Sequence, residues 1–236
     1  MTNHFDEQNL LDHWQQVNHQ VMEACTNAKG RENGGVDLLA VSKTKPAEMI
    51  AFLAKQGQRD FGENYLQEAL EKIKALQKRA EATHIVWHYI GHIQRNKTRD
   101  IAENFDWVQT VERDIIAKRL HNQRPDDLAP LNVLIQVNID NEDSKSGCLP
   151  EALPELVATI MEYERLQLRG LMIIPAQADT DAFARTKQLF DGIKKVHPEL
   201  RAWDTLSMGM SGDMTAAIAH GATMVRVGSA IFGARG

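Results

Sequence analysis

DLLAVSKTKPAEMIAFLAKQG, residues 37–57, is the stretch that decides the fold. It begins with a short, almost continuous apolar run, which is typical of a strand covered on both faces in a parallel sheet. Its second half places Pro46 at a first-turn position and closes on Gly57, as helices with a defined start and stop do. The segment therefore predicts a strand at 37–43, a tight turn and a helix at 46–57, which together make one βα unit.

The same alternation of strand and helix continues along the rest of the chain. Further strands are predicted at 59–63, 86–91, 107–111, 132–139, 168–174, 205–209 and 224–228. Amphipathic helices are predicted at 65–80, 113–123, 150–163, 179–197 and 211–220, and an extra helix at 6–26 precedes the first strand. No linker rich in Pro, Gly or Ser interrupts the pattern, so we expect one domain over residues 1–236.

Eight βα units in 236 residues match the size of a TIM (β/α)8 barrel. A doubly wound open sheet is the competing arrangement. Its dinucleotide-binding version carries a GxGxxG motif in the first βα turn, and the turn SKTKP lacks that motif. The predicted fold is therefore a TIM barrel with an extra N-terminal helix.

Composition limits the function classes. Apolar residues make up 43% of the chain, charged residues make up 25%, and the formal net charge is -5, so nothing indicates non-specific nucleic-acid binding. The N-terminus lacks the basic start and apolar core of a signal peptide, and no stretch has the apolar length of a membrane span. Cys25 and Cys148 form no CxxC motif and are expected to be reduced thiols. We expect a cytoplasmic protein without nucleic-acid or membrane partners.

Lys43 ends the first predicted strand, and an active site in a TIM barrel lies at that end. Apolar walls around an amine disfavour its charged form, which lowers its pKa and suits it to a Schiff base with a carbonyl group. The structural alternative is a strand-end lysine whose charge reaches solvent or an ion-pair partner. Lys45 stands just before Pro46, where a solvated loop lysine is expected.

The C-terminal stretch SMGMSGDMTAAIAHGATMVRVGSAIFG predicts an anion site. Small residues follow the seventh and eighth strands, and loops at those two positions are the usual phosphate site of TIM barrels. A helix expected to start near Ser211 would direct its N-terminus there, unless Ser211 and Asp213 are ordinary capping residues. Arg226 lies inside an apolar strand, so it needs either an ion-pair partner or a polar atom of the ligand.

Two other patterns are poor candidates for metal binding. His84, His88 and His92 recur every fourth residue, but four residues of a strand span about 13 Å, too far for neighbouring side chains to share a zinc ion. The acidic loop at 140–147 lacks EF-hand spacing and is predicted to be a mobile loop.

Taken together, these motifs resemble those of the pyridoxal phosphate homeostasis protein family, single-domain relatives of the N-terminal barrel of alanine racemase. The resemblance covers about residues 37–235 and rests on AVSKTKP, DFGENYLQE, WHYIGHIQRNK, VNIDNEDSKSG, RGLMIIP and LSMGMSGDMTAAIAHGATMVRVGSAIFGAR. His92, in GHIQ, stands where many bacterial members have proline, which leaves its role open.

The resemblance assigns the residues that would bind pyridoxal 5'-phosphate. It implies that Lys43 carries the cofactor as an internal aldimine, that Asn64 lies near the cofactor, and that Arg226 faces the pyridine nitrogen. The phosphate would lie against Ser211, Gly228 and Ser229. A permanently charged guanidinium at the pyridine nitrogen disfavours its protonation and weakens the ring as an electron sink.

Three functions remain open at this point. The resemblance implies a cofactor-binding homeostasis protein without established turnover, which could pass the cofactor to apo-enzymes. An amino-acid racemase of this type needs a tyrosine from a second domain of a partner subunit, for which the chain has no room, and we therefore expect a monomer. A cofactor-free Schiff-base aldolase would explain Lys43 and the phosphate site, but Arg226 less naturally.

Overall fold

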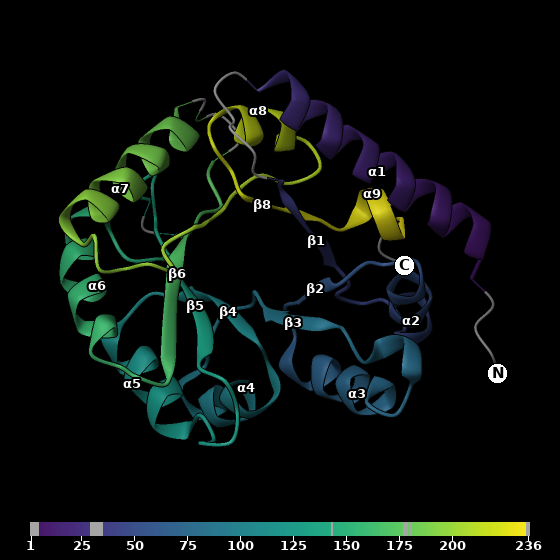
Figure 1. Ribbon diagram of the computed structural model, residues 1–236, viewed down its shortest axis with the longest axis horizontal. Coiled ribbons are helices and arrows are strands. Elements are labelled where there is room, and N and C mark those ends of the chain that lie inside the picture. The colour runs from purple at the N-terminus through teal and green to yellow at the C-terminus, as the bar shows by residue number, and fades with distance from the viewer. Residues whose placement is uncertain (1–4, 29–34, 143, 177–178, 180, 235–236) are drawn as a thin grey trace.

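The computed structural model describes residues 5–28, 35–142, 144–176, 179 and 181–234. Eight parallel strands form a closed barrel in chain order, with β8 paired to β1. The strands are β1 (Asp37–Val41), β2 (Asp60–Glu63), β3 (Val86–Tyr89), β4 (Trp107–Val111), β5 (Leu131–Gln136), β6 (Leu166–Met172), β7 (Thr205–Ser207) and β8 (Met224–Val227). Helices surround these strands (Figure 1), and the predicted TIM barrel is confirmed.

The helices follow the strands as the βα pattern predicts. They are α1 (Glu7–Asn27), α2 (Ala47–Lys55), α3 (Leu66–Leu76), α4 (Thr98–Asn104), α5 (Asp114–Gln123), α6 (Leu153–Met161), α7 (Ala182–Val196), α8 (Met214–Ala219) and α9 (Ser229–Phe232), with short 3-10 turns η1 (Ala80–Ala82), η2 (Arg95–Lys97) and η3 (Pro150–Ala152). The extra N-terminal helix is α1, which packs against α8, α9 and α2 on the outside of the barrel (Figure 1). Helices α4 and α9 were not predicted.

Strand ends differ from the prediction in a consistent direction. Six strands stop one to three residues earlier than expected; β1 ends at Val41 rather than at Lys43. The chain leaves the sheet while its residues are still apolar, because residues such as Ile90 and Ile174 line a cavity above the strands instead of extending the ladder. Apolar periodicity alone cannot separate these two kinds of burial.

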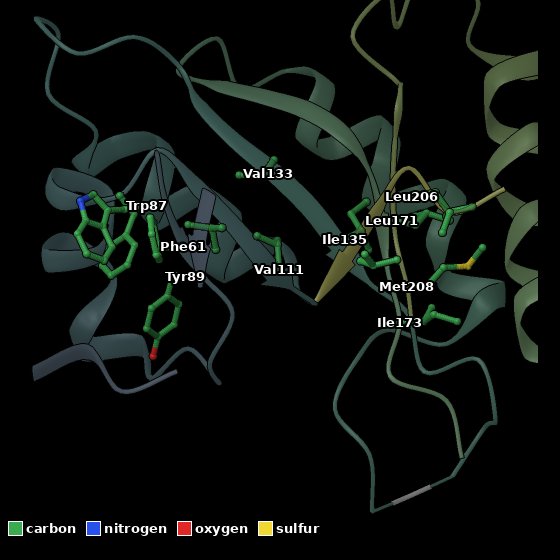
Figure 2. Close-up of a cluster of buried hydrophobic side chains, with 14 of the residues drawn as sticks. Phe61, Trp87, Tyr89, Val111, Val133, Ile135, Leu171, Ile173, Leu206 and Met208 are labelled. Atoms are coloured by element: carbon green, nitrogen blue, oxygen red, sulfur yellow. The ribbon is translucent and has the colours of Figure 1, made fainter. Parts of the chain in front are cut away.

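Apolar side chains fill the space between the strands and the helices. Phe61 and Trp87 on neighbouring strands pack with ring centroids 6.3 Å apart, and Figure 2 shows both beside Tyr89. They share one large cluster with helix residues such as Ile50 and Leu120. A smaller cluster joins Trp107, Leu134 and Met172. Among the described residues no helix is both long and apolar enough to cross a membrane.

Candidate functional site

A cavity of about 320 Å³ opens at the carboxyl ends of the strands. All six residues that the sequence assigned to the cofactor line it, together with apolar and small neighbours. The lining residues are Val41, Lys43, Lys45, Asn64, Ile90, Met172, Ile174, Met210, Ser211, Gly212, Arg226, Gly228, Ser229, Phe232 and Gly233. Closure of the barrel therefore brings the first βα turn and the last two strand ends around one space.

Lys43 reaches this cavity from a turn, not from a strand. After β1, the Lys45 N–H donates to the Ser42 carbonyl over 3.1 Å, which closes a four-residue turn with Lys43 at its second position. Lys45 also lines the cavity, and its Nζ donates to the Ala234 carbonyl over 2.8 Å. Lys45 is thus a loop lysine, as expected, and it also binds the backbone of Ala234, an exposed residue.

The turns after β7 and β8 supply the small residues that line the cavity. Ser211 lies in a turn before α8, which begins only at Met214, so the predicted helix start at Ser211 is wrong. The Asp213 carboxylate accepts the Met210 N–H over 2.6 Å and thereby closes that turn before the helix begins. Gly228 precedes α9, whose first residue is Ser229. The structure thus brings Ser211, Gly228 and Ser229 into the lining of the same cavity as Lys43.

Arg226 enters the cavity from β8 and is 95% buried. Its two terminal nitrogens donate to the Ser207 hydroxyl and to the Ile173 carbonyl, each over 2.8 Å. Burial lowers the pKa of Arg226 to about 10, so the guanidinium stays charged at neutral pH. No carboxylate of the described residues forms an ion pair with it, so of the two alternatives the structural ion pair is not formed there, and neutral groups accept its hydrogen bonds instead.

A chain of hydrogen bonds runs from Arg226 through the barrel. The Ser207 hydroxyl donates to Gln109 Oε1 over 2.7 Å, and Gln109 Nε2 lies 3.0 Å from His88 Nδ1. Because β4 and β7 are not sheet neighbours, this chain must cross the barrel interior. An amide nitrogen can only donate, so His88 accepts at Nδ1 and its Nε2–H donates to Asp60 over 2.9 Å. Of these five residues, sequence reasoning identified only Arg226 as a site residue.

Asn64 lies at the end of β2. Its Nδ2 donates to the Ile90 carbonyl over 3.4 Å, while its buried Oδ1 has no hydrogen-bond partner among the described residues. A buried polar atom without a partner is costly, and such atoms are found where a ligand or water completes the bonding. Asn64 is therefore a candidate for ligand contact.

The remaining singled-out residues lie away from the cavity. His92 is exposed, and its carbonyl accepts from the Tyr89 hydroxyl over 3.0 Å. The described part of the acidic loop is tied to its surroundings, since Asp140 accepts the Ala176 N–H over 2.7 Å and Glu112 accepts the Gly147 N–H over 3.0 Å. Within the described ranges, no three His, Cys, Asp or Glu side chains are grouped as metal ligands would be.

Comparison with known proteins identifies the family. The family model for the alanine racemase N-terminal domain matches residues 15–236. The pyridoxal phosphate homeostasis protein of Escherichia coli strain K12 is 51% identical over 225 residues, covering 93% of this chain and 94% of its own. The protein of the same name from Haemophilus influenzae is 49% identical over 221 residues, covering 92% of each chain.

A solved structure agrees with these relatives. PipY of Synechococcus elongatus PCC7942 with PLP bound superposes with a TM-score of 0.76 at 31% identity, covering 91% of this chain and all of PipY. The matched family model and the curated relatives both span nearly the whole length of the chain. The chain therefore belongs to the pyridoxal phosphate homeostasis protein family, which is built on the alanine racemase N-terminal domain.

Proposed function

We propose that this chain binds pyridoxal 5'-phosphate through a Schiff base on Lys43 and serves intracellular homeostasis of that cofactor without catalytic turnover. The observation that carries the proposal is that one cavity gathers Lys43, the buried Arg226 and the small residues after β7 and β8. Condensation of the Lys43 amine with the cofactor aldehyde forms one C=N bond and releases one water. PipY with PLP bound, and the names of the curated relatives, support the same reading.

The residues present fit this cofactor. A volume of about 320 Å³ lies at the lower end of the range for small-molecule sites, ~300–1,000 Å³. The apolar walls suit the ring, and Ile90 and Met172 supply two of them. Asn64 brings a buried oxygen that lacks a partner, and Arg226 brings a charge that persists at neutral pH. When bound, the cofactor supplies an aldehyde and an electron-withdrawing ring.

Arg226 also favours a carrier over an enzyme. A guanidinium has only N–H donors, so it can bond to the pyridine nitrogen only while that nitrogen is unprotonated. It therefore stabilises the neutral ring, which accepts electrons less well than the protonated ring does. Neither Tyr65 nor Tyr89 lines the cavity; Tyr65 is 52% exposed and the Tyr89 hydroxyl donates to the His92 carbonyl. Among the described residues, therefore, no tyrosine lines the cavity with Lys43, and a racemase would have to take its tyrosine from a second domain.

The first experiment measures the absorbance of the purified protein before and after borohydride reduction. We expect a Schiff-base band that reduction removes, and peptide mass analysis should locate the reduced adduct on Lys43. Lys43→Ala should abolish the band, whereas Lys45→Ala, the matched lysine that lines the same cavity, should largely keep it. A protein that stays colourless after incubation with the cofactor would overturn the proposal.

A second assay separates the carrier from the racemase. The loaded protein is incubated with alanine and other amino acids, and optical activity is followed against a Lys43→Ala control. We expect no inversion above that control, and turnover at about 1 per second or faster, an ordinary enzyme rate, would replace the carrier with the racemase.

The wider setting is proposed in the same terms. We propose that residues 1–236 act as one cofactor-binding domain, monomeric and cytoplasmic, whose partners include apo-enzymes that need the cofactor. A dimer in sedimentation at micromolar concentration would contradict the monomer. Direct delivery would be contradicted if no apo-enzyme tested gains activity faster from the loaded protein than from an equal amount of free cofactor.

A further inference from the structure

Thr44, the residue after Lys43, has an unusual backbone conformation. Its φ is 64°, in the left-handed region that β-branched residues rarely adopt. The four-residue turn from Ser42 to Lys45 closes with a hydrogen bond between its end residues, and Thr44 occupies its third position. A positive φ at that position is the mark of a type II turn, which ordinarily holds Gly or Asn there. A threonine persists in such a place only where its surroundings hold it.

The surroundings of Thr44 contain the contact that holds it. The Glu68 carboxylate, on α3, accepts the Thr44 N–H over 2.6 Å. The same oxygen of Glu68 lies 2.5 Å from the ammonium of Lys72, one helical turn further along α3. Glu68 is thereby fixed in place by Lys72 while it binds the strained residue.

Lys72 also binds the turn directly. It is 94% buried, and its Nζ donates to the Ser42 carbonyl over 2.8 Å and to Glu63 over 2.7 Å. With Glu68 as the third acceptor, all three N–H donors of the ammonium have partners. Lys72 therefore ties the first residue of the turn to α3 directly and ties the third residue through Glu68. Any relaxation of Thr44 toward negative φ would rotate the peptide that joins it to Lys43.

We propose that Glu68 and Lys72 are positioning residues that hold Thr44 in its strained conformation and so keep Lys43 directed into the cavity. The proposal rests on the proposed function of Lys43 as the site of cofactor attachment. Neither Glu68 nor Lys72 lines the cavity, so both act through the turn and not through contact with the ligand.

The test is a double-mutant cycle that combines Glu68→Ala with Thr44→Gly. The glycine adopts the positive φ without strain, so it removes the need for the hydrogen bond to Glu68. Cofactor affinity and the rate of Schiff-base formation are followed by absorbance. In the protein that keeps Thr44, Glu68→Ala should weaken cofactor binding about tenfold, as expected for the loss of a charged hydrogen bond. In the Thr44→Gly protein, the same change should cost less than about threefold, because glycine adopts the turn without support.

Two controls make the cycle specific. Glu71→Ala removes an exposed carboxylate from the same helix that, unlike Glu68, accepts no hydrogen bond from the described turn, and it should leave affinity within about twofold of the parent. Glu68→Gln keeps an oxygen that can accept the Thr44 N–H, so it should give a smaller loss than Glu68→Ala. This milder variant measures the same bond if the alanine variant does not fold.

An equal loss from Glu68→Ala in both backgrounds, or no loss in either, would overturn the proposal. A second readout needs no cofactor. Exchange of the Thr44 amide hydrogen should be slow in the parent and in Glu71→Ala, and clearly faster in Glu68→Ala. If the parent never attaches the cofactor at Lys43, the proposed function fails, and the positioning role stands or falls on this exchange measurement alone.

Discussion

Asp37 illustrates how a single carboxyl group is affected by the barrel around it. Asp37 is the first residue of β1, at the end of the strand opposite the cavity, and it is exposed there. Burial raises the pKa of Asp37, and the nearby charge of Asp60 raises it further, while the positive charge of Arg169 acts in the opposite direction. A raised pKa means that the folded protein holds the proton of this carboxyl more tightly than the unfolded chain does.

We expect Asp37→Asn to raise the free energy of unfolding at pH 7. The charged carboxylate is disfavoured in the folded state, and the neutral amide avoids that cost. Solvent screening keeps the gain small, because the residue is partly exposed. The difference should shrink as pH falls through the raised pKa, and should vanish below about pH 4, where aspartate is neutral in both states. Urea unfolding at both pH values measures it; equal midpoints at pH 7 would contradict the expectation.

At the scale of elements, the segment after β3 approaches the end of β2 very closely. A Cβ built on Gly91 would lie 2.0 Å from the Asn64 carbonyl oxygen, a backbone atom that cannot move alone. The Gly91 carbonyl accepts from the Thr110 hydroxyl over 2.7 Å, which fixes the segment from its other side. The position of Asn64 in the cavity thus depends on the absence of a side chain at Gly91, in the segment that follows the neighbouring strand β3.

Gly91→Ala should destabilise the protein by about 2–4 kcal/mol, the range for steric conflict with buried backbone. It should also weaken cofactor binding, since Asn64 must move. Gly192→Ala is the matched control: this glycine lies in α7 and has nothing within 4 Å of its added Cβ. Alanine there should leave binding unchanged and raise stability by up to about 1 kcal/mol. Urea denaturation and cofactor titration of both variants test this expectation. Comparable effects of the two alanines would show that the close contact between Gly91 and the Asn64 backbone does not hold Asn64 in place.

Elements with strong periodicity could be predicted from the sequence, and weakly marked ones could not. All eight strands and most helices were expected close to where they occur. Helix α4 was missed because it has seven residues and no side-chain cap at its start. Lys72 was missed as a positioning residue, although it is buried on the same face of α3 as Ala69 and Leu76. A lysine at such a position indicates a buried partner, but periodicity cannot name a partner on another element.

For the whole molecule, the bonds that cross the barrel interior link β2, β3, β4, β7 and β8. In the series of hydrogen bonds from Arg226 to Asp60, the donor or acceptor role of each side chain is determined by the side chains it bonds to. The series therefore acts as a unit. Sequence reasoning found Arg226 but not the rest, because Ser207 and Gln109 meet only when the barrel closes. Their separation along the chain and their ordinary residue types leave no local signal.

Gln109→Leu should destabilise the protein by about 2–4 kcal/mol, because it leaves Ser207 and His88 buried without their partner. Ser207→Ala in the Gln109→Leu background should cost less than it does alone, because one of the two hydrogen bonds it removes, the one to Gln109, is already broken while the one from Arg226 remains. Thr159→Ala, on the outer helix α6, should instead add to Gln109→Leu without coupling. Urea unfolding of the single and double variants measures both cycles, and strict additivity of Gln109 and Ser207 would contradict a connected chain.

The pairing of β1 with β8 has a consequence for biosynthesis. The turn that carries Lys43 follows the first strand, whereas Arg226 belongs to the last, and α1 rests on α8 and α9 (Figure 1). During translation the cavity therefore stays open beside the Lys43 turn until β8, the last strand of the barrel, has left the ribosome and paired with β1. A chain still being synthesised offers the reactive aldehyde a lysine without its enclosure. We therefore expect a nascent chain to retain the cofactor only after β8 has emerged and paired with β1, which places the gain of binding late in synthesis of the barrel.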